Sequence, residues 1–339
     1  MPNYLLIFVA ALVVTIVATP LARRAALGMN IIDQPESRKL HRAPVPLLGG
    51  VAIYAAFIAA ILVFGEALNL PQLFGILIGA TAVSALGVWD DRRKVRPLVK
   101  LGGQAAAALF VVATGTQVAL FDNPADYAIS VFWIVIITNA LNLLDNMDGL
   151  SGGVAAVASG FFLLLALLQG QYLVATLSAA LLGACLGFLW YNFNPASIFM
   201  GDAGSLFLGF VLAAVGIRLR FPGQLTAISW MIPVFVLGVP LFDTLLVVVS
   251  RLRRGLNPLT TPGRDHLSHR LVAIGLSQRR AVVTIYLMCV VLGVLGSVLV
   301  YSKLEIAYAI AGIASLAALS ALVALERVNY GGLASASTP

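Results

Sequence analysis

Residues 151–190 read SGGVAAVASGFFLLLALLQGQYLVATLSAALLGACLGFLW, and they include no Lys, Arg, Asp, Glu or His. A helix needs about 20 mostly apolar residues to cross the hydrocarbon core of a bilayer. The stretch has room for two such helices around the polar turn Gln169-Gly170-Gln171. It therefore predicts two membrane-spanning helices, at residues 151–169 and 171–190.

The rest of the chain repeats this pattern. Its 339 residues are 60% hydrophobic and only 10% charged, with a mean hydropathy of +0.99, whereas a soluble domain is roughly a quarter charged. The composition excludes a water-soluble globule and predicts an all-α, polytopic integral membrane bundle of about 11 transmembrane helices. The other predicted spans are 3–21, 47–65, 71–89, 98–118, 127–144, 205–220, 225–249, 281–302 and 306–325.

Basic residues are distributed unevenly between the loops. When the loops are assigned alternately to two sides, one side receives 18 of the 21 Lys and Arg, and the other keeps Arg218, Arg220 and Lys303. The positive-inside rule places the basic side in the cytoplasm, so we expect a periplasmic N-terminus and a cytoplasmic C-terminus. We expect residues 1–330 to form a single transmembrane catalytic domain and residues 331–339 to be a disordered tail.

Five polar segments lie on the predicted cytoplasmic side. The first, DQPESRKLHRAPVPLLGG at residues 33–50, contains Arg38, Lys39 and His41. These basic side chains indicate contact with a phosphorylated substrate, although a solvated basic loop explains Arg38 and Lys39 equally well.

The second segment, GVWDDRRKVRP at residues 87–97, places two adjacent carboxylates, Asp90 and Asp91, at the end of an apolar span, with Lys100 following. Like charges in one site raise one of the two pKa values, which suits a general base or a cation site. The alternative is a pair of acids neutralised by Arg92 and Arg93.

The third segment, NALNLLDNMDGLSGG at residues 139–153, contains no Lys or Arg. If the helix continues through it, Asn142, Asp145 and Asp148 recur every third residue and share one face. Uncompensated carboxylates at a membrane boundary require a cation or a donor-rich ligand. The segment therefore predicts a ligand site.

The fourth segment, NFNPASIFMGDAGS at residues 192–205, contains Asn192 and a single charge, Asp202, in a turn that leads into the next span. Glycines and a helix N-terminus favour phosphate binding. A simple N-cap role for Asp202 explains the same pattern.

The fifth segment is the loop of residues 251–270, with Arg264, His266, His269 and Arg270. Several bases with one carboxylate fit a clamp for phosphate or sugar. Zinc binding by the two histidines is disfavoured, because Cys185 and Cys289 lie inside apolar spans and leave no third soft ligand. Asp243, inside the ninth span, is a weaker candidate that we expect to pair with Arg251 or with a neighbouring loop.

Taken together, hard carboxylates without a thiol indicate Mg²⁺, with Mn²⁺ as the alternative. Arginine, lysine and glycine-rich turns indicate phosphate, and the position at the membrane boundary indicates that one substrate is a lipid. Phosphoryl transfer between a soluble diphosphate and a lipid phosphate satisfies all three conditions.

One stretch from each of the five segments carries a resemblance to the polyprenyl-phosphate N-acetylhexosamine-1-phosphate transferase superfamily, over residues ~30 to ~275. The stretches are DQPESRKLHRAPVPLLGG, GVWDDRRKVRP, NALNLLDNMDGLSGG, NFNPASIFMGDAGSLFLGF and GRDHLSHRL. The nearest branch is that of the bacterial undecaprenyl-phosphate N-acetylglucosamine-1-phosphate transferases. Phospho-MurNAc-pentapeptide translocase is a more distant relative, with a run of three histidines that this chain lacks.

The resemblance implies a role for each matching residue. It implies that Asp90 and Asp91 are the acid pair, with Asp90 as the base, that Asp202 is the Mg²⁺ ligand, and that Lys100 contacts phosphate. It further implies that Asn142, Asp145 and Asp148 lie near the nucleotide and the metal, and that Asp145 is a second metal ligand. Asn192 is implied near the diphosphate. The residues implied around the sugar are Arg264, His266, His269 and Arg270. Many members have adjacent histidines where this chain has Ser268-His269, which leaves open whether His269 is catalytic or positional.

The implied reaction joins a UDP-N-acetylhexosamine, with UDP-GlcNAc as the expected donor, to undecaprenyl phosphate and releases UMP. It is expected at the cytoplasmic face of the bacterial inner membrane, as the first membrane step of cell-envelope polysaccharide synthesis, without nucleic acid and with a possible homodimer. Direct attack by the lipid phosphate on the β-phosphorus is the expected route, and a covalent aspartyl-phosphate intermediate is the alternative. The alternative functions are a phospho-MurNAc-pentapeptide transferase or a transporter of a phosphorylated solute.

Overall fold

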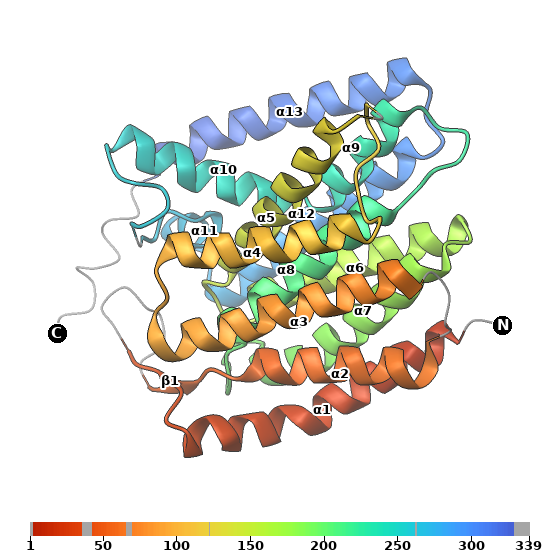
Figure 1. Cartoon of the computed structure of the whole chain (residues 1–339). Helices are drawn as coiled ribbons and strands as arrows, with labels where there is room; N and C mark the ends of the chain where they lie inside the picture. The colour runs from red at the N-terminus through yellow and green to blue at the C-terminus, as the bar shows by residue number, and fades with distance from the viewer. Residues whose placement is uncertain (1–2, 36–42, 66–69, 122, 262, 329–339) are drawn as a thin grey trace.

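The computed structural model describes residues 3–35, 43–65, 70–121, 123–261 and 263–328 (Figure 1). Helices account for about three quarters of these residues, because apolar segments in lipid must satisfy their backbone hydrogen bonds internally. The helices are α1 (Tyr4–Gly28), α2 (Gly49–Phe64), α3 (Leu70–Arg93), α4 (Pro97–Ala113), α5 (Ala125–Leu144), α6 (Leu150–Leu168), α7 (Tyr172–Asn192), α8 (Gly201–Arg218), α9 (Thr226–Val236), α10 (Gly238–Arg253), α11 (Leu267–Ala273), α12 (Gln278–Leu299) and α13 (Leu304–Glu326).

Each predicted span falls on a helix, but the helices differ in length and continuity. Eight helices in the described part of the chain are long and apolar enough to cross a membrane. A ninth crossing is broken, since α9 and α10 together pass this test but meet at an angle of 74°. The helices α2 and α4 are apolar but have only 16 and 17 residues. The protein is therefore a helical, multi-pass membrane protein.

The helix α8 forms the centre of the bundle. All its residues are buried except Asp202 and Arg218, one at each end. It ends at Arg218, two residues before the end of the predicted span 205–220. Close packing at its start depends on glycine, because a Cβ on Gly50 of α2 would lie 2.1 Å from the backbone nitrogen of Gly204.

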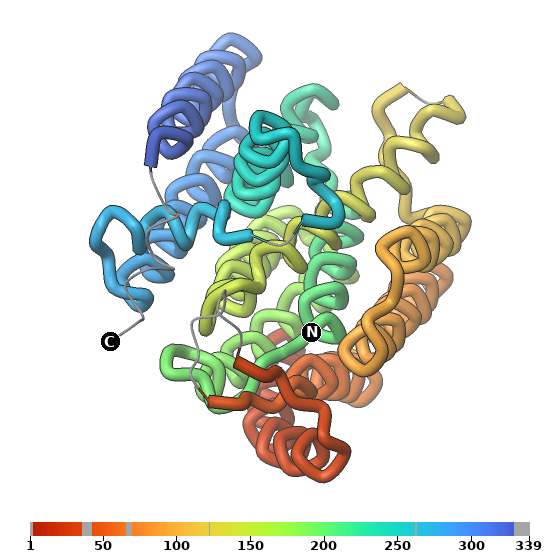
Figure 2. The backbone as a smooth tube through the Cα atoms, turned by 90° about the vertical axis from the view of Figure 1, so that its left-hand side faces the viewer, coloured from red at the N-terminus to blue at the C-terminus, as the bar shows by residue number. Residues whose placement is uncertain are grey.

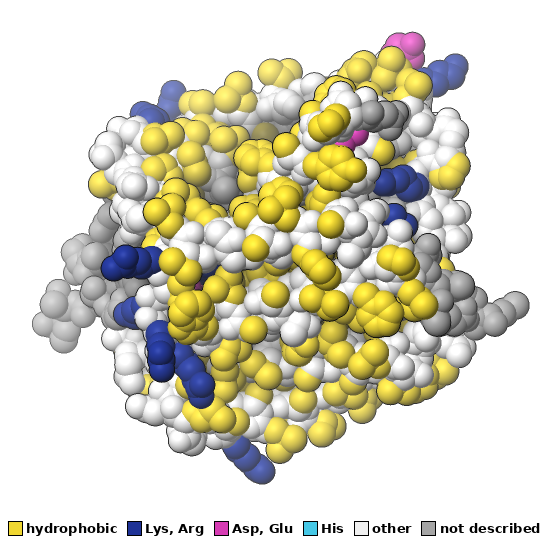
Figure 3. Space-filling model, in the orientation of Figure 1, with side chains coloured by type: hydrophobic (Ala, Val, Ile, Leu, Met, Phe, Trp, Pro, Cys, Tyr) yellow, Lys and Arg dark blue, Asp and Glu magenta, His cyan; other side chains and the backbone are white. Residues whose placement is uncertain are grey.

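The outer helices α1 and α13 lie at opposite edges of the bundle (Figures 1 and 2). Only Ala307 of α13 is buried, and this helix exposes a row of large apolar side chains that includes Ile313 and Leu316. Hydrophobic side chains cover the middle of the face in Figure 3, while Lys and Arg lie toward its ends. This distribution fits a belt of lipid around the helices.

The ends of two helices decide where the polar side chains lie. The helix α5 ends at Leu144, where the predicted span 127–144 also ends, so it does not continue through Asp148. The helix α8 begins at Gly201, earlier than the predicted span 205–220, so Asp202 lies in its first turn. A two-stranded antiparallel ribbon, β1 (Ile32–Asp33) with β2 (Val45–Pro46), also departs from a purely helical fold. The predicted tail, 331–339, lies outside the described residues.

Candidate active site

The polar segments meet at one end of the bundle, which faces the viewer in Figure 2. The helices α3, α5 and α10 end there, and α4 and α8 begin there (Figure 1). The topology thus gathers side chains that are more than 100 residues apart in the chain.

Asp91 of α3 caps the N-terminus of α8. Its Oδ1 accepts a hydrogen bond from the backbone nitrogen of Asp202 at 2.8 Å, and its Oδ2 accepts one from Ala203 at 3.2 Å. The first N–H groups of a helix have no partner within the helix, so a carboxylate from a neighbouring helix stabilises this terminus. The close approach requires glycine, since a Cβ on Gly201 (φ +67°) or on Gly87 would clash with Asp91 or Asp202.

Lys100 of α4 joins three of the predicted residues. Its ammonium donates hydrogen bonds to Asp90 at 2.9 Å, to Asn142 at 3.2 Å, and to Asp202. The Lys100 side chain is only 14% exposed, so water screens these ion pairs weakly. One cation therefore holds together two carboxylates that would otherwise repel each other.

Asn142, near the end of α5, completes this cluster. Its Nδ2 donates to Asp202 Oδ1 at 2.8 Å and to Ser205 Oγ at 2.9 Å. Ser205 in turn donates to the carbonyl of Gly201 at 3.1 Å. We call Asp90, Asp91, Lys100, Asn142 and Asp202 the carboxylate cluster.

Asp145 lies next to this cluster but has a different environment. Its carboxylate makes no hydrogen bond or ion pair within the described residues, and it is partly buried. Burial, followed by the charges of Asp202, Asp91 and Asp148, raises the pKa of Asp145 well above its usual value. A cation or hydrogen-bond donor at this position would relieve that repulsion.

Asp148 and Asn192 hold the neighbouring loop instead of pointing to the carboxylate cluster. Asp148 Oδ2 accepts hydrogen bonds from Asn194 Nδ2 at 2.9 Å and from the backbone of Ala196 at 3.0 Å. Asn192 is buried; its amide accepts from the backbone of Gly149 and donates to that of Ile198. The Asn192 side-chain amide therefore links the end of α7 to the start of α6.

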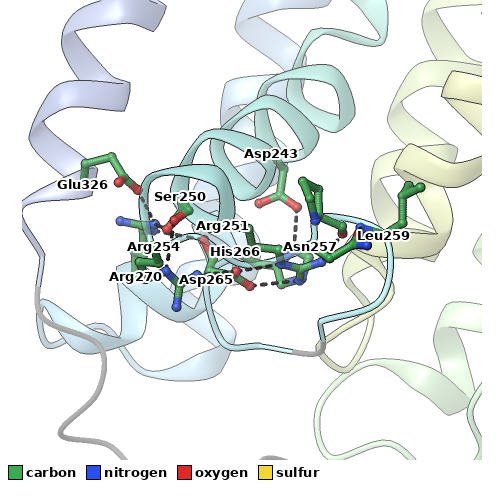
Figure 4. A network of polar contacts seen from close by, with 11 residues as sticks. Asp243, Ser250, Arg251, Arg254, Asn257, Leu259, Asp265, His266, Arg270 and Glu326 are labelled. Carbon is green, nitrogen blue, oxygen red and sulfur yellow. Dashed lines mark hydrogen bonds and ion pairs between the residues drawn. The ribbon is translucent and has the colours of Figure 1, made fainter.

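Asp243, on α10 of the broken ninth crossing, pairs with the loop of residues 251–270, one of the two partners that the sequence predicts. One oxygen lies 2.8 Å from His266 Nδ1, and the other accepts a hydrogen bond from the backbone nitrogen of Leu267 at 2.6 Å. Asp243 and His266 are both buried and face each other between α10 and the loop (Figure 4). The carboxylate therefore fixes the orientation of the imidazole ring.

His269 lies one turn further along α11. It is buried, its Nδ1 has no partner among the described atoms, and its ring centroid is 6.3 Å from that of His266. Burial, with the charges of His266 and Arg264, lowers the pKa of His269 to about 4. The side chain is therefore neutral near pH 7.

Ser268, the residue that departs from the family pattern, connects the loop to the third segment. Its hydroxyl donates to Asn146 Oδ1 at 2.5 Å. Asn146 directly follows Asp145, so this bond positions α11 against the turn after α5.

Arg270 bonds to its own loop, to α10 and to the end of α13. It is fully buried and donates to Glu326 at 2.6 Å, to Ser250 at 2.9 Å, and to the carbonyls of Asp265 and Leu325. Asp265 accepts from Arg251 and Arg254 at 2.8 Å each. Burial opposes ionisation of Asp265, but the bonds and charge of Arg251 outweigh it and lower its pKa. Figure 4 shows that this network ties the loop to α10 and α13.

Of the remaining predicted residues, the structure describes Arg264 but not the three in the first segment. Arg264 is partly buried and near enough to His269 to influence its charge. Arg38, Lys39 and His41 lie outside the described residues. Ser205 and Asn146 were not among the predicted site residues, although they lie inside the fourth and third polar segments.

No group of three or more His, Cys, Asp or Glu among the described residues is arranged to hold a metal ion. Mg²⁺ is usually held by one or two carboxylates together with substrate phosphates and water. The unpartnered carboxylate of Asp145, beside Asp202, fits that smaller requirement.

Known proteins share this sequence pattern. Residues 73–220 match the model of glycosyl transferase family 4. A Bacillus subtilis protein named "Probable undecaprenyl-phosphate N-acetylglucosaminyl 1-phosphate transferase" is 37% identical over 83% of this chain and 80% of its own length. The decaprenyl-phosphate N-acetylglucosaminephosphotransferase of Mycolicibacterium smegmatis is 32% identical over 83% and 78%. The undecaprenyl-phosphate alpha-N-acetylglucosaminyl 1-phosphate transferase of Escherichia coli O157:H7 is 28% identical over 83% and 80%.

Proposed function

This chain belongs to glycosyl transferase family 4, and from that membership we propose that it transfers N-acetylglucosamine 1-phosphate from UDP-N-acetylglucosamine to undecaprenyl phosphate. The products are UMP and undecaprenyl-diphospho-N-acetylglucosamine. The observation that carries the proposal is the convergence of Asp90, Asn142 and Asp202 on one lysine at the end of an apolar bundle. A phosphorylated lipid reaches such a site without leaving the membrane.

In the proposed reaction, an oxygen of the lipid phosphate attacks the β-phosphorus of the donor. A new P–O bond forms there, and the bond from the β-phosphorus to the oxygen bridging to the α-phosphate breaks, so that UMP leaves with that oxygen. Direct attack predicts inversion at phosphorus, and retention would indicate a covalent intermediate instead.

The residues of the carboxylate cluster and of the loop have different roles in the proposed reaction. Hydrogen bonds from Val95 and Lys100 favour the carboxylate form of Asp90, the form that accepts a proton from a protonated lipid phosphate. Lys100 places a positive charge where phosphate oxygens arrive. His266, oriented by Asp243, and the neutral His269 face the donor from the loop.

We include Mg²⁺ in the proposal, with Asp145 and Asp202 as its protein ligands. When bound, the ion would offset charge that develops on the donor diphosphate. The support is chemical: both ligands are hard oxygen donors, and Asp145 has no other partner within the described residues.

We further propose that the chain crosses the bacterial inner membrane eleven times, with α2, α4 and the broken α9–α10 pair as crossings. The carboxylate cluster would then face the cytoplasm, where UDP-sugars are made. The support is the excess of Lys and Arg in the loops of that side.

The test is to incubate the purified protein with undecaprenyl phosphate, Mg²⁺ and a panel of UDP-sugars, and to measure released UMP. The expected result is release with UDP-N-acetylglucosamine that requires both the lipid and Asp202, so that Asp202→Ala abolishes it. Release with UDP-MurNAc-pentapeptide alone, or solute uptake without UMP release, would contradict the proposal.

A further inference from the structure

A cavity of about 270 Å³ lies at the opposite end of the bundle from the carboxylate cluster. Its lining includes Arg220, Phe221 and Gln224 from the segment after α8, and Ser229 and Trp230 from α9. No residue of the proposed reaction lies in it.

The backbone around the cavity is fixed. The side-chain amide of Gln171 accepts a hydrogen bond from the Arg220 nitrogen at 2.9 Å and donates one to the Arg220 carbonyl. The Gln224 amide donates to the carbonyls of Leu299, Val300 and Ser302 at 3.0–3.1 Å. Trp230 packs edge-on against Trp133, with ring centroids 6.1 Å apart. The cavity is therefore preorganised by its surroundings.

The two arginines at this end have no anionic partner within the described residues. Among the described residues, Arg220 donates only to the carbonyls of Ile217, Leu219 and Gln117, and Arg218 only to that of Gly115. The Nε of Arg218 is buried and has no hydrogen-bond partner in the part of the chain that the structure describes. The buried acid of this end, Asp126, instead accepts bonds from the backbone of Leu120 and Phe121.

Arg220 is exposed, and an exposed guanidinium with no acidic partner among the described residues attracts an anion at the edge of an apolar region. The residues that line the cavity include the basic Arg220 and the aromatic Trp230 and Phe221, a combination that matches a ligand that is charged at one end and apolar at the other. Tryptophan is also enriched where membranes meet water.

From these observations we propose that the cavity binds an anionic phospholipid from the leaflet opposite the carboxylate cluster, with its phosphodiester on Arg220. Arg218 adds a second positive charge nearby, since its charge acts on Arg220. Two guanidiniums repel the ammonium of a zwitterionic headgroup, so phosphatidylglycerol is bound in preference to phosphatidylcholine.

The test uses tryptophan fluorescence, because the chain has four tryptophans and two of them, Trp133 and Trp230, lie at this end. A Trp89→Phe, Trp190→Phe background removes the other two. This protein is placed in phosphatidylcholine vesicles that contain increasing fractions of phosphatidylglycerol with brominated acyl chains, which quench nearby indoles. Brominated phosphatidylcholine provides the reference.

Phosphatidylglycerol is expected to quench at lower fractions than phosphatidylcholine, and Arg220→Gln should raise the required fraction about tenfold, the loss of one charge-assisted hydrogen bond. Ser229→Leu narrows the cavity while Arg220 stays in place, and it should have the same effect, which keeps the test valid if Arg220→Gln unfolds. The matched control, Lys303→Gln, removes an exposed charge at the same end and should change nothing. Equal quenching by both lipids, or relief of quenching by excess inorganic phosphate, would overturn the lipid site.

Discussion

Replacing Asp243 with Asn should slow the proposed transfer through its effect on His266. The carboxylate contacts His266 Nδ1 at 2.8 Å and the Leu267 nitrogen at 2.6 Å, in a buried setting. The Asn side chain keeps an oxygen that accepts from the Leu267 nitrogen, but it places an NH₂ donor against the imidazole where the carboxylate had an acceptor. His266 must then present a lone pair at Nδ1 and carry its proton on Nε2, which reverses the role of the nitrogen that faces away from Asp243.

The magnitude follows from the bond that is lost. A hydrogen bond to a charged group contributes about 1.5–3 kcal/mol, and about 1.4 kcal/mol corresponds to a tenfold change. We therefore expect Asp243→Asn to lower kcat/KM for UDP-N-acetylglucosamine by about 10- to 150-fold.

The assay is a double-mutant cycle on UMP release, with Asp243→Asn, His266→Gln and the double variant. If Asp243 acts through His266, the double variant should be no slower than His266→Gln alone. Losses that multiply across the two sites would refute the reasoning, because they would mean that each residue acts separately. Arg253→Gln is the control: this residue is 67% exposed and makes a surface ion pair with Glu326, which is expected to matter little.

Three further predictions concern the site. Lys100→Met should leave Asp90 and Asp202 without their shared cation, at a cost of about 3–5 kcal/mol, and should reduce UMP release at least about 100-fold. The control Arg96→Met removes an exposed charge and should not reduce it. Activity of Lys100→Met above a tenth of the original would contradict the prediction. Folded His269 has a pKa of about 4 against about 6.5 unfolded, so its stabilisation is complete above pH 6.5 and falls by about 2 kcal/mol by pH 5; His269→Gln should flatten this part of the melting-temperature profile, and identical profiles would argue against it. Asp145→Asn should raise the Mg²⁺ concentration for half-maximal activity about tenfold, and an unchanged Mg²⁺ dependence would remove Asp145 from the metal site.

The membrane-spanning pattern was readable from the sequence, because span length depends only on local hydrophobicity. The predicted spans at 151–169 and 171–190 became α6 and α7 almost without change. The broken crossing at α9–α10 was not predicted, although Pro233 lies inside α9. A proline disrupts a helix, but the 74° bend also depends on packing against other helices.

The set of polar segments at one end also followed from the sequence, since alternating spans return to the same side of the membrane. The division of roles within each segment did not. Asp90 and Asp91 are neighbours, yet one meets Lys100 and the other caps α8, because successive side chains on a helix point about 100° apart. Asp148 holds a loop while Asp145 has no partner among the described residues, because α5 ends between Asn142 and Asp145.

The sequence by itself determined which residues enter the membrane and which charged residues gather at its surface, because both depend on transfer free energies that each segment carries alone. Only the tertiary structure decided that Lys100 joins two carboxylates, that Asp243 orients His266, and that Arg270 is buried against Glu326. These pairings depend on the rotation of each helix about its axis and on where it ends, and packing against neighbouring helices sets both.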